Sequence, residues 1–587
     1  MATKDLIQNT LCDYLNTSYG LNLSPNELVI NETRKEFEGH YTLVCFPFTR
    51  LLKKSPDLIA TEIGEALLKD IDFIEKFNTV KGFLNLSLSN KVWKSSLKEW
   101  HPDKINKQTP QTIVVEYSSP NTNKPLHLGH IRNNLLGYSV CSILKEAGHK
   151  VIKTNITNDR GIHICKSMLA WKKFGNGENP KDSKIKGDHL VGKYYVKFDK
   201  EYKKQVKELI STGQDEKEAN ENAPILIEAR ELLIKWEKKD PETISIWKTM
   251  NQWVYDGFEK TYQRMGIDFD KVYYESDTYL VGKEIVEDGL KKGYCYQKND
   301  GSIWVDLESH NLDEKILLRS DGTSVYITQD IGTAQLRYDD YKMDRSVYVV
   351  GNEQDYHFKA LKAILKEFNK EWNDSLYHLS YGMVDLPSGK MKSREGTVVD
   401  ADDILQEMHD TAKEQTLKLG KIDSFTESEA NELYEMIGLG ALKFFLLKVD
   451  PKKSILFNPE ESIDFQGFTG PFVQYTHARI QSMLRKHGEI KYDIDKAVID
   501  ENEIGLLILL NKYTDILYES ADEMNPALIA NYAFEISKSF NRYYAKQPIL
   551  AEKDINTRNL RIELCLKTGL TLTKTMGLLG IALPDSM

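Results

Sequence analysis

The chain has 587 residues, which at about 100 to 200 residues per domain gives roughly three to five domains and excludes a single small binding module. Its 78 Lys and Arg against 88 Asp and Glu give a net charge of −10, which argues against non-specific coating of nucleic acid or an anionic membrane by the whole surface. With 41% hydrophobic and 10% aromatic residues, the composition is that of a globular protein and not of a disordered one.

Cysteine usage and the N-terminus indicate the compartment. The 6 cysteines are scattered without a CxxC pair, so the sequence predicts neither a disulfide framework nor a protein-bound zinc. The N-terminal residues lack the apolar core of a secretory signal, and no stretch approaches the roughly 20 apolar residues that a membrane span needs. We therefore expect a soluble, cytoplasmic protein with no membrane partner.

Residues 1–105 mix strand and helix patterns and predict a small α+β domain. Strand-like runs lie at 41–48 and 82–89, with a helical run between them at 56–69. The polar segment 101–111 contains two prolines and is typical of a linker into the next domain.

A strand, a loop, a helix and a second strand follow. The strand-like runs are 112–119 and 151–157, and the helical run 130–148 ends at Gly148, a residue type that favours helix C-termini. This order predicts a Rossmann-like α/β fold with a parallel sheet, in which ligands bind beyond the carboxyl end of the first strand. We assign residues 106–430 to this core.

The rest of the chain is predicted to contain an insertion and a helical bundle. The charge-rich helical segment at about 171–270 is interpreted as a solvated insertion that splits the core. Strand-like runs return at 302–307, 324–330 and 345–351. From 431 to 587 the pattern is almost wholly helical and predicts a bundle.

The strongest chemical signal is the word HLGH, where the first strand of the core leads into its helix. His127 and His130 stand about one turn apart at the predicted helix N-terminus, where backbone N–H groups and the helix dipole favour phosphate. Gly129 lacks a Cβ, so a nucleotide can approach the backbone closely.

A second signal is the loop GKMKSREGTVVD at 389–400. Its Lys390, Lys392 and Arg394 are clustered cations that could neutralise the charge of a triphosphate as pyrophosphate leaves. Taken alone, the loop would be interpreted as an ordinary basic surface segment. The presence of HLGH favours the phosphate role.

Together HLGH and KMKSR resemble the two signature motifs of class I aminoacyl-tRNA synthetases. The longer words EYSSPNTNKPLHLGHIRNN, DGTSVYITQDIGTA and GPFVQYTHARI are similar to those of arginyl-tRNA synthetases. The resemblance covers essentially the whole chain, including GFLN in the N-terminal domain and the terminal LGIALPDSM.

The resemblance implies activation of L-arginine by ATP to arginyl-adenylate, followed by transfer to the 2′-hydroxyl of the terminal adenosine of tRNA. This chemistry needs no enzyme nucleophile and relies on positioning and charge stabilisation. The implied partners are tRNA, ATP and L-arginine, with Mg²⁺ carried on the ATP phosphates and not by a protein metal cluster. Most members of the family are monomers, so a monomer is expected.

The resemblance also assigns the ATP site. Its residues would be His127, Gly129, His130, Lys390, Met391 and Ser393. The family's second motif is usually written KMSKS, and Ser393 stands where its fourth-place lysine is expected. Either Lys124, just ahead of HLGH, or Lys392 could supply the missing charge, and the sequence does not choose between them.

An arginine pocket must satisfy five guanidinium donors and a fixed charge, which calls for carboxylates and neutral acceptors. Tyr326 and Asp330 would share a face if their segment is helical. The carboxylates of Glu116 and Asp330 would favour the forked guanidinium over the ammonium of lysine. By resemblance, the arginine-binding residues are Glu116, Asn121, His127, Tyr326, Asp330 and Gln354.

Two groups of residues are candidates for tRNA contacts. In the N-terminal domain, Phe83 and Asn85 match the place where the family reads a base of the tRNA elbow, by stacking and hydrogen bonding. In the helical bundle, Phe472, Tyr475 and Arg479 recur at helical spacing and could hold unpaired anticodon bases. The alternative, that Phe472 and Tyr475 belong to the bundle core, has equal weight.

Two other functions remain as alternatives. A small-cofactor nucleotidyltransferase could carry HxGH, but such chains are much shorter and would not need the helical bundle. A non-catalytic tRNA-binding regulatory paralogue could share the architecture. The retention of both motifs and of a chemically competent arginine pocket argues against it.

Overall fold

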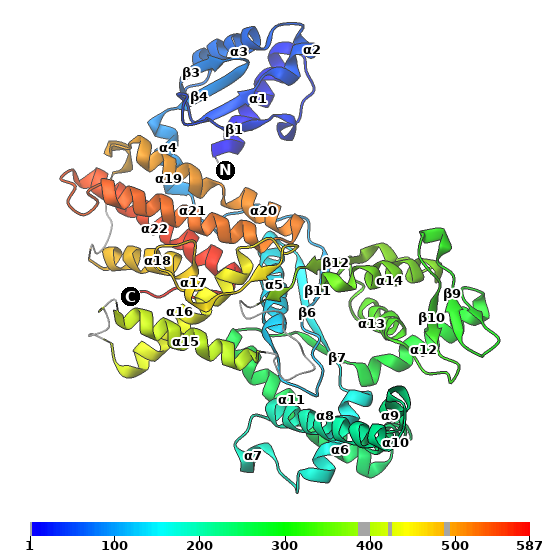
Figure 1. Cartoon of the computed structure of the whole chain (residues 1–587). Helices are drawn as coiled ribbons and strands as arrows, with labels where there is room; N and C mark the ends of the chain where they lie inside the picture. Colours follow the sequence, from blue (N-terminus) through cyan, green and yellow to red (C-terminus); the bar gives the residue numbers. More distant parts are fainter. Residues whose placement is uncertain (1–2, 386–398, 419, 421–424, 487–492) are drawn as a thin grey trace.

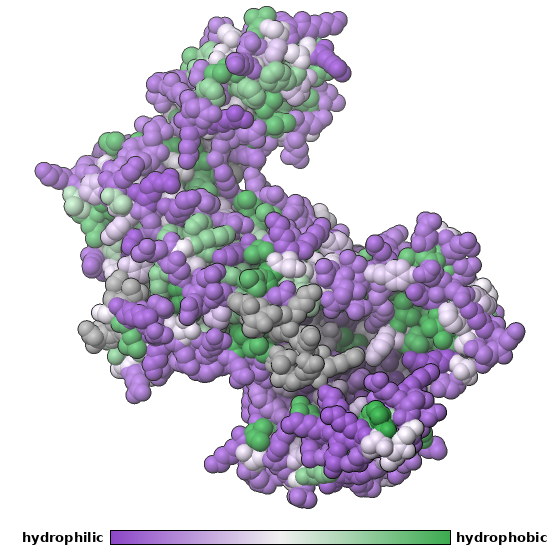
Figure 2. Space-filling model, viewed as in Figure 1, coloured by the Kyte–Doolittle hydropathy of each residue, from purple (hydrophilic) through white to green (hydrophobic). Residues whose placement is uncertain are grey.

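The computed structural model describes residues 3–385, 399–418, 420, 425–486 and 493–587. An N-terminal domain stands above a helical bundle, which adjoins a central parallel sheet with two lobes beyond it (Figure 1). The visible surface is mostly hydrophilic, and a deep notch separates the N-terminal domain from the lobe at the right (Figure 2). Within the described ranges, no helix is long and apolar enough to cross a membrane.

The N-terminal domain is an α+β unit, as expected. Its antiparallel sheet has the order β1-β2-β4-β3. The strands obey the two-residue period, because the alternate residues Leu84, Leu86 and Leu88 are buried in the core. The elements are β1 (Ile30–Glu32), β2 (Tyr41–Val44), β3 (Ile74–Val80), β4 (Phe83–Leu88), α1 (Thr3–Tyr19), α2 (Thr49–Leu52), α3 (Pro56–Asp70) and α4 (Asn90–Glu99).

The central sheet is parallel throughout, which confirms the Rossmann-like expectation. Its order is β12-β11-β5-β6-β7. The chain runs from β5 to β6 and β7 on one side of β5, and it later returns to place β11 and β12 on the other side. The gap between β5 and β11 is therefore the topological switch point, where open α/β sheets bind ligands. The strands are β5 (Thr112–Glu116), β6 (Lys150–Thr157), β7 (Lys271–Tyr274), β11 (Arg345–Gly351) and β12 (Leu376–Tyr381).

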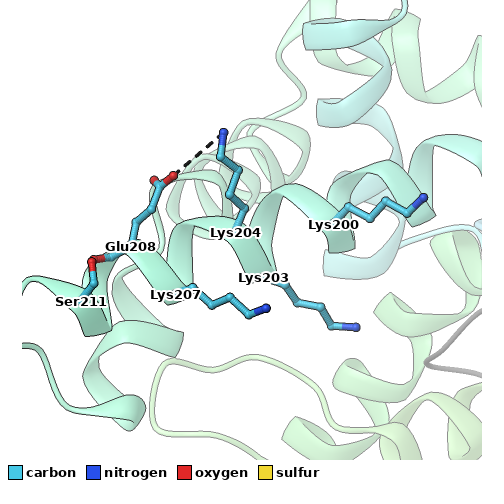
Figure 3. A pocket seen from close by; sticks show the side chains of 6 residues that line it. All are labelled: Lys200, Lys203, Lys204, Lys207, Glu208 and Ser211. Carbon is cyan, nitrogen blue, oxygen red and sulfur yellow. Dashed lines mark hydrogen bonds and ion pairs between the residues drawn. The ribbon is translucent and has the colours of Figure 1, made fainter.

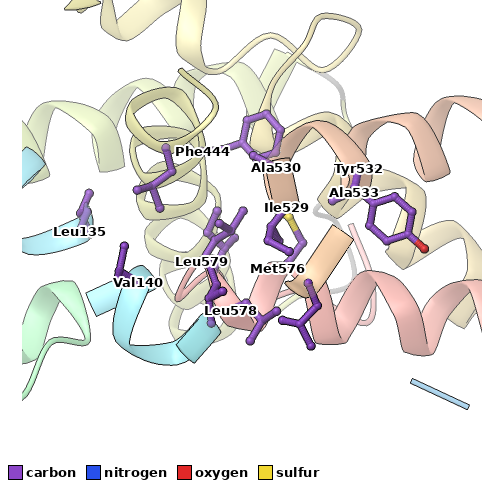
Figure 4. Close-up of a cluster of buried hydrophobic side chains, with 14 of the residues drawn as sticks. Leu135, Val140, Phe444, Ile529, Ala530, Tyr532, Ala533, Met576, Leu578 and Leu579 are labelled. Atoms are coloured by element: carbon purple, nitrogen blue, oxygen red, sulfur yellow. The ribbon is translucent and has the colours of Figure 1, made fainter. Parts of the chain in front are cut away.

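The helix α5 (Leu128–Ala147) connects β5 to β6 and ends at Gly148, whose φ of 116° is easily adopted only by glycine. Side chains of α5 pack against helices of the bundle, including Phe444, Ile529 and Met576 (Figure 4). Because α5 and the bundle share one core, the start of α5 is held on a rigid body.

The lobe at the right of Figure 1 contains the elements between β7 and β11, together with α14, which follows β11. The run 302–307 does contain a strand, but it joins a separate antiparallel sheet of order β10-β9-β8 and not the core. The strand expected at 324–330 is wrong, because a helix begins at Tyr326. The elements are α12 (Glu275–Lys292), β8 (Tyr296–Gln297), β9 (Ile303–Val305), β10 (Lys315–Leu318), α13 (Tyr326–Tyr341) and α14 (Asp355–Glu367).

The charge-rich insertion is helical. It comprises α6 (Ile162–Phe174), α7 (Pro180–Ser183), α8 (Gly187–Ser211), α9 (Glu216–Asn222), α10 (Pro224–Glu237) and α11 (Pro241–Met265). The later turns of α8 match the expected solvated face, where Lys203 and Lys207 extend from one side and Lys204 lies 4.0 Å from Glu208 (Figure 3). The first two turns of α8 differ from that expectation because they are largely buried.

The C-terminal part is the helical bundle that the sequence predicts. A two-stranded parallel pair joins β13, which precedes the bundle helices, to β14, which follows α16. The elements are β13 (Val384–Asp385), α15 (Ala401–Lys418), α16 (Glu427–Leu447), β14 (Ile455–Leu456), α17 (Pro459–Ser462), α18 (Gly470–Arg485), α19 (Glu501–Asn511), α20 (Tyr513–Glu523), α21 (Pro526–Lys546) and α22 (Ile555–Leu578).

Candidate active site

The HLGH turn lies at the start of α5, beyond the carboxyl end of β5. His127 is the N-cap residue, and its backbone N–H donates to Nδ1 of His130 at 3.1 Å. The two imidazole rings lie 3.8 Å apart between centroids. A Cβ at Gly129 would lie 3.1 Å from the His127 ring, so glycine allows that ring to lie against the backbone. The turn thus presents two imidazoles on one helix N-terminus.

Both imidazoles are held neutral. Burial, followed by the nearby charge of Lys124, lowers the pKa of His127 to about 4. The pKa of His130 also lies well below its ordinary value, because of burial and then of the charges of His127 and Lys124. Burial lowers the pKa of Lys124 as well. At neutral pH the turn therefore offers neutral hydrogen-bonding imidazoles with a lysine beside them.

The backbone that follows the second motif lies against the HLGH turn. The N–H of Leu128 donates to the carbonyl of Val399 at 3.3 Å, and the N–H of Ala401 donates to the carbonyl of Leu126 at 2.9 Å. These two bonds lie on either side of His127. The second motif itself, with Lys390, Met391, Lys392, Ser393 and Arg394, falls outside the described residues.

Asn133 fixes the start of α5 to the switch point. Its Oδ1 accepts from the N–H of Ser118 at 2.5 Å, and its Nδ2 donates to the carbonyl of Val349 at 2.5 Å. Ser118 has a φ of 69°, a left-handed conformation that costs energy in a residue with a Cβ. One amide therefore ties the ends of β5 and β11 to the start of α5.

Arg132, the preceding residue, is a second anchor. It is only 2% exposed, and its guanidinium donates to four backbone carbonyls at 2.6 to 3.1 Å. These carbonyls belong to Gly382, Met383, Pro451 and Lys453. The arginine thus joins α5 to the chain that leaves β12 and to the turn after α16.

Four acidic side chains gather at the carboxyl edge of the sheet, and we call them the carboxylate group. Glu116 ends β5, Asp159 lies two residues after β6, Glu275 follows β7 directly, and Asp330 comes from α13. The charges of Asp330, Asp159 and Glu116 all act on Glu275, so the four lie near one another. Parallel strands place their ends at one edge, which explains how residues distant in sequence meet here.

Glu116 is occupied by an internal partner. It is 7% exposed and forms an ion pair with Arg337 of α13, whose side chain is fully buried. The guanidinium of Arg337 also lies 5.1 Å from the ring of Tyr273 and 5.3 Å from that of Tyr348. Burial raises the pKa of Glu116, and Arg337 opposes that shift. The pair links β5 to α13 at the carboxyl edge of the sheet.

Asp159 and Asp330 are each held by contacts with neighbouring residues. Asp159 accepts from the backbone N–H of Ser276 at 2.9 Å and from its hydroxyl at 2.7 Å. A carboxylate oxygen of Asp330 lies 2.5 Å from Nε2 of His357 in α14. Since Asp330 keeps 34% of its side chain exposed, its carboxylate is accessible to a ligand.

Glu275 was missed in the sequence. Burial, followed by the charges of Asp330 and Asp159, raises its pKa to about 8, and Arg160 only partly opposes them. An acid with this pKa is mostly protonated at neutral pH and would ionise beside an added cation. The sequence signal for Glu275 was its position immediately after the short strand at 271–274. This strand was not recognised, because it directly follows the segment that was interpreted as the charged insertion.

The other residues assigned to arginine surround this edge. Asn121 forms a parallel bridge with Asn158, in the turn between β5 and α5. Tyr326 begins α13 and is 69% exposed. Asp330 lies four residues later in the same helix, so the two residues share a helix face, as expected. Gln354 is exposed in the 3₁₀ turn Asn352–Gln354 that follows β11.

In the N-terminal domain, Phe83 is exposed but Asn85 is not. Phe83 is 38% exposed and packs edge-on against the exposed Phe46 at 5.5 Å. Asn85 is only 2% exposed, and its Oδ1 accepts from the hydroxyl of Thr42 at 2.6 Å. The exposed neighbour of Phe83 is therefore the ring of Phe46, and the side-chain amide of Asn85 lies beneath the surface.

In the bundle, Arg479 lies between two tyrosines. Its guanidinium carbon is 4.9 Å from the ring centroid of Tyr475 and 5.3 Å from that of Tyr544, which the sequence analysis missed. Phe472 is half-buried against Phe534 at 5.2 Å, as the core alternative expects. Tyr544 comes from α21 and is 40% exposed, so the aromatic and guanidinium surface combines α18 and α21.

Three family matches account for most of the chain. Residues 3–88 match the arginyl tRNA synthetase N terminal domain, residues 95–458 the catalytic domain of tRNA synthetases class I (R), and residues 473–587 the DALR anticodon binding domain.

Curated relatives match over the full length. The arginine–tRNA ligase of Bacteroides fragilis strain YCH46 is 50% identical over 598 residues, covering 100% of both chains. That of Amoebophilus asiaticus is 51% identical, covering 100% of this chain and 99% of its own.

Solved structures share the fold at lower identity. The arginyl-tRNA synthetase of Thermus thermophilus superposes with a TM-score of 0.77 at 24% identity, covering 100% of both chains. The methionyl-tRNA synthetase of Mycobacterium tuberculosis superposes with a TM-score of 0.50 at 12% identity, covering 80% of this chain and 92% of its own.

Proposed function

Because the chain belongs to the arginyl-tRNA synthetase family, we propose that its carboxylate group and HLGH turn together form the site that activates arginine with ATP. The activity is arginine–tRNA ligation: arginyl-adenylate forms with release of pyrophosphate, and the arginyl group passes to the 2′-hydroxyl of the terminal tRNA adenosine. Nothing found favours the non-catalytic paralogue.

The observation that carries the pocket assignment is the excess of acid at the carboxyl edge of the sheet. Four carboxylates lie near two guanidiniums, those of Arg160 and Arg337, so the group lacks positive charge. A bound arginine side chain would supply it, and Asp330 offers an accessible carboxylate for a forked contact. The arginine-binding residues we propose are Glu116, Asn121, His127, Glu275, Tyr326, Asp330 and Gln354.

The ATP phosphates are proposed to lie against the HLGH turn. The helix N-terminus attracts them, and the neutral imidazoles of His127 and His130 can donate hydrogen bonds to phosphate oxygens. Lys124 lies close enough to lower both histidine pKa values, which supports it as the substitute for the missing motif lysine, while Lys392 remains the alternative. ATP is expected to bring Mg²⁺ on its phosphates.

The chemical step then needs only positioning. The arginine carboxylate attacks the α-phosphorus, the bond to pyrophosphate breaks, and no enzyme group becomes covalently attached. Holding the two reactants in line lowers the barrier, while N–H donors and cations receive the charge that develops on the leaving group.

We propose tRNA-binding surfaces at the two ends of the chain. Residues 1–105 would contact the tRNA elbow through the exposed ring of Phe83, with the buried Asn85 bonded to Thr42 beneath it, and residues 431–587 would hold anticodon bases through Tyr475 and Arg479, with the half-buried Phe472 beside them. Exposed rings and a guanidinium are suited to stacking on splayed bases. We further propose that residues 106–430 act as the catalytic domain of a cytoplasmic monomer.

Charging of bulk tRNA with each of the twenty amino acids tests this function. Incorporation of arginine alone is expected. Tight tRNA binding without any charging would instead identify a regulatory paralogue, and charging with another amino acid would refute the pocket assignment.

A further inference from the structure

The insertion is in contact with the catalytic turn. Gly192 of α8 faces Pro125, and a Cβ at Gly192 would lie 3.0 Å from the Pro125 ring. Most residues around it in the first two turns of α8 are buried, unlike the lysine-rich later turns. The start of α8 therefore packs directly against the segment that leads into HLGH.

The same end of α8 is joined by ion pairs to the start of α15. The ammonium of Lys186 lies 2.6 Å from a carboxylate oxygen of Asp402 and 3.0 Å from one of Asp188. It also donates to the hydroxyl of Thr261 in α11 at 2.5 Å, and that hydroxyl donates to the other oxygen of Asp402 at 2.9 Å. Asp188 is fully buried, so this network is shielded from solvent on one side.

His189 completes the network. Its Nε2 lies 3.0 Å from Asp402 and 3.4 Å from Asp400. Asp400 in turn accepts from the backbone N–H of Asp402, in the first turn of α15, at 2.8 Å. Lys186 already supplies the cation between Asp188 and Asp402, so the network is complete without a metal ion.

Asp402 lies next to backbone that pairs with HLGH. Asp400 forms an antiparallel bridge with His127, and the N–H of Ala401 donates to the carbonyl of Leu126. A displacement of the start of α15 would therefore be transmitted through these bonds to His127.

We propose that Asp402, held by Lys186 and His189, is a positioning residue that sets His127 for ATP. The inference rests on the proposed role of the HLGH turn. In this proposal, the insertion holds in place the backbone that lies beside the HLGH turn. Asp402 touches no substrate and acts through the hydrogen bonds that flank His127.

The expected effect follows from the contacts of Asp402. Replacing it with Asn removes the negative charge that faces both the Lys186 ammonium and the His189 ring, and leaves Lys186 with less compensation. The start of α15 would then move relative to α8. A displacement of about 1 Å at a catalytic group can reduce a rate about 100-fold, so we expect a loss of about 10- to 100-fold in kcat/KM for ATP.

The test measures ATP–pyrophosphate exchange with tRNA and arginine present. D402N should raise the KM for ATP or lower kcat, with the KM for arginine and the Kd for tRNA changing less than about twofold, and D402E should recover most of the activity. The matched control is E242Q, which breaks the ion pair of Lys172 with Glu242 at 2.5 Å, far along α11 from Thr261. That control should behave as wild type.

Other outcomes would overturn the proposal. Unchanged ATP kinetics in D402N would show that the network does not position the turn. An equal loss in ATP, arginine and tRNA parameters with a lower Tm would assign Asp402 a purely structural role. If D402N does not fold, H189Q provides the second variant, and ATP kinetics unchanged in H189Q would equally exclude the network.

A third variant separates failure of this inference from failure of the site assignment. H127N removes the imidazole itself, so it should impair ATP use whether or not Asp402 matters. An effect in H127N without one in D402N would refute only the positioning role. No effect in H127N would refute the assignment of HLGH to ATP.

Discussion

Arginine binding should release a proton from Glu275. With its pKa raised to about 8, the side chain is about 90% protonated at pH 7, since the ratio of acid to base is about tenfold one unit below the pKa. A guanidinium bound among the carboxylates favours the ionised form and should bring this pKa to about 5 or lower, so that Glu275 is almost fully ionised in the complex at pH 6 and above. The expected release is therefore about 0.9 proton per arginine at pH 7 and about 0.1 at pH 9.

The same linkage sets the pH dependence of affinity. Arginine binds the ionised form, whose fraction rises from about 0.01 at pH 6 to about 0.09 at pH 7, so the Kd should fall about ninefold over that unit. Above pH 8 the dependence should level off, because Glu275 is then already ionised.

Isothermal titration calorimetry measures both quantities. Titrations of arginine in buffers with different ionisation enthalpies give the number of protons released, and E275Q, which cannot ionise, serves as the control. Wild-type protein that binds arginine at pH 7 without proton release would refute the reasoning. An equal release in E275Q would assign the proton to another group.

Three further predictions concern the remaining site residues. Asp330→Ala should abolish arginine use in pyrophosphate exchange, since it removes the accessible carboxylate, while tRNA binding measured by filter retention should stay within about twofold; full activity would contradict the pocket. His127 and His130 have lowered pKa values and stay neutral above pH 6, so their ring NMR signals should not titrate between pH 6 and 8; a midpoint near 6.5 would contradict their burial. Phe83→Ala and Tyr544→Ala should each raise the Kd for tRNA about fivefold or more, because stacking on a base contributes about 1–3 kcal/mol, with the KM for arginine unchanged; equal binding would exclude stacking there.

The sequence predicted features that local pattern controls. The catalytic helix and its end at Gly148 follow from apolar spacing and from a glycine suited to positive φ. The helix beginning at Tyr326 was taken for a strand, because VYIT is rich in β-favouring residues while the helical period of Ile327, Ile331 and Ala334 extends beyond that short window.

Local sequence pattern could not predict the features that depend on contacts between distant residues. The raised pKa of Glu275 comes from carboxylates that the sheet topology brings together, and no nearby residue signals it. The buried start of α8 lies in the same charged segment as the exposed lysines, and only its packing against Pro125 distinguishes the two parts. Tyr544 meets Arg479 because two bundle helices are adjacent.

The most direct test of the central claim is ATP–pyrophosphate exchange with each of the twenty amino acids, run with and without bulk tRNA. The carboxylate group should admit only the forked cation, so exchange should occur with arginine and with neither lysine nor any neutral amino acid. Comparable exchange with a neutral amino acid, or no exchange from folded protein that binds tRNA, would contradict the assignment of this site to arginine activation.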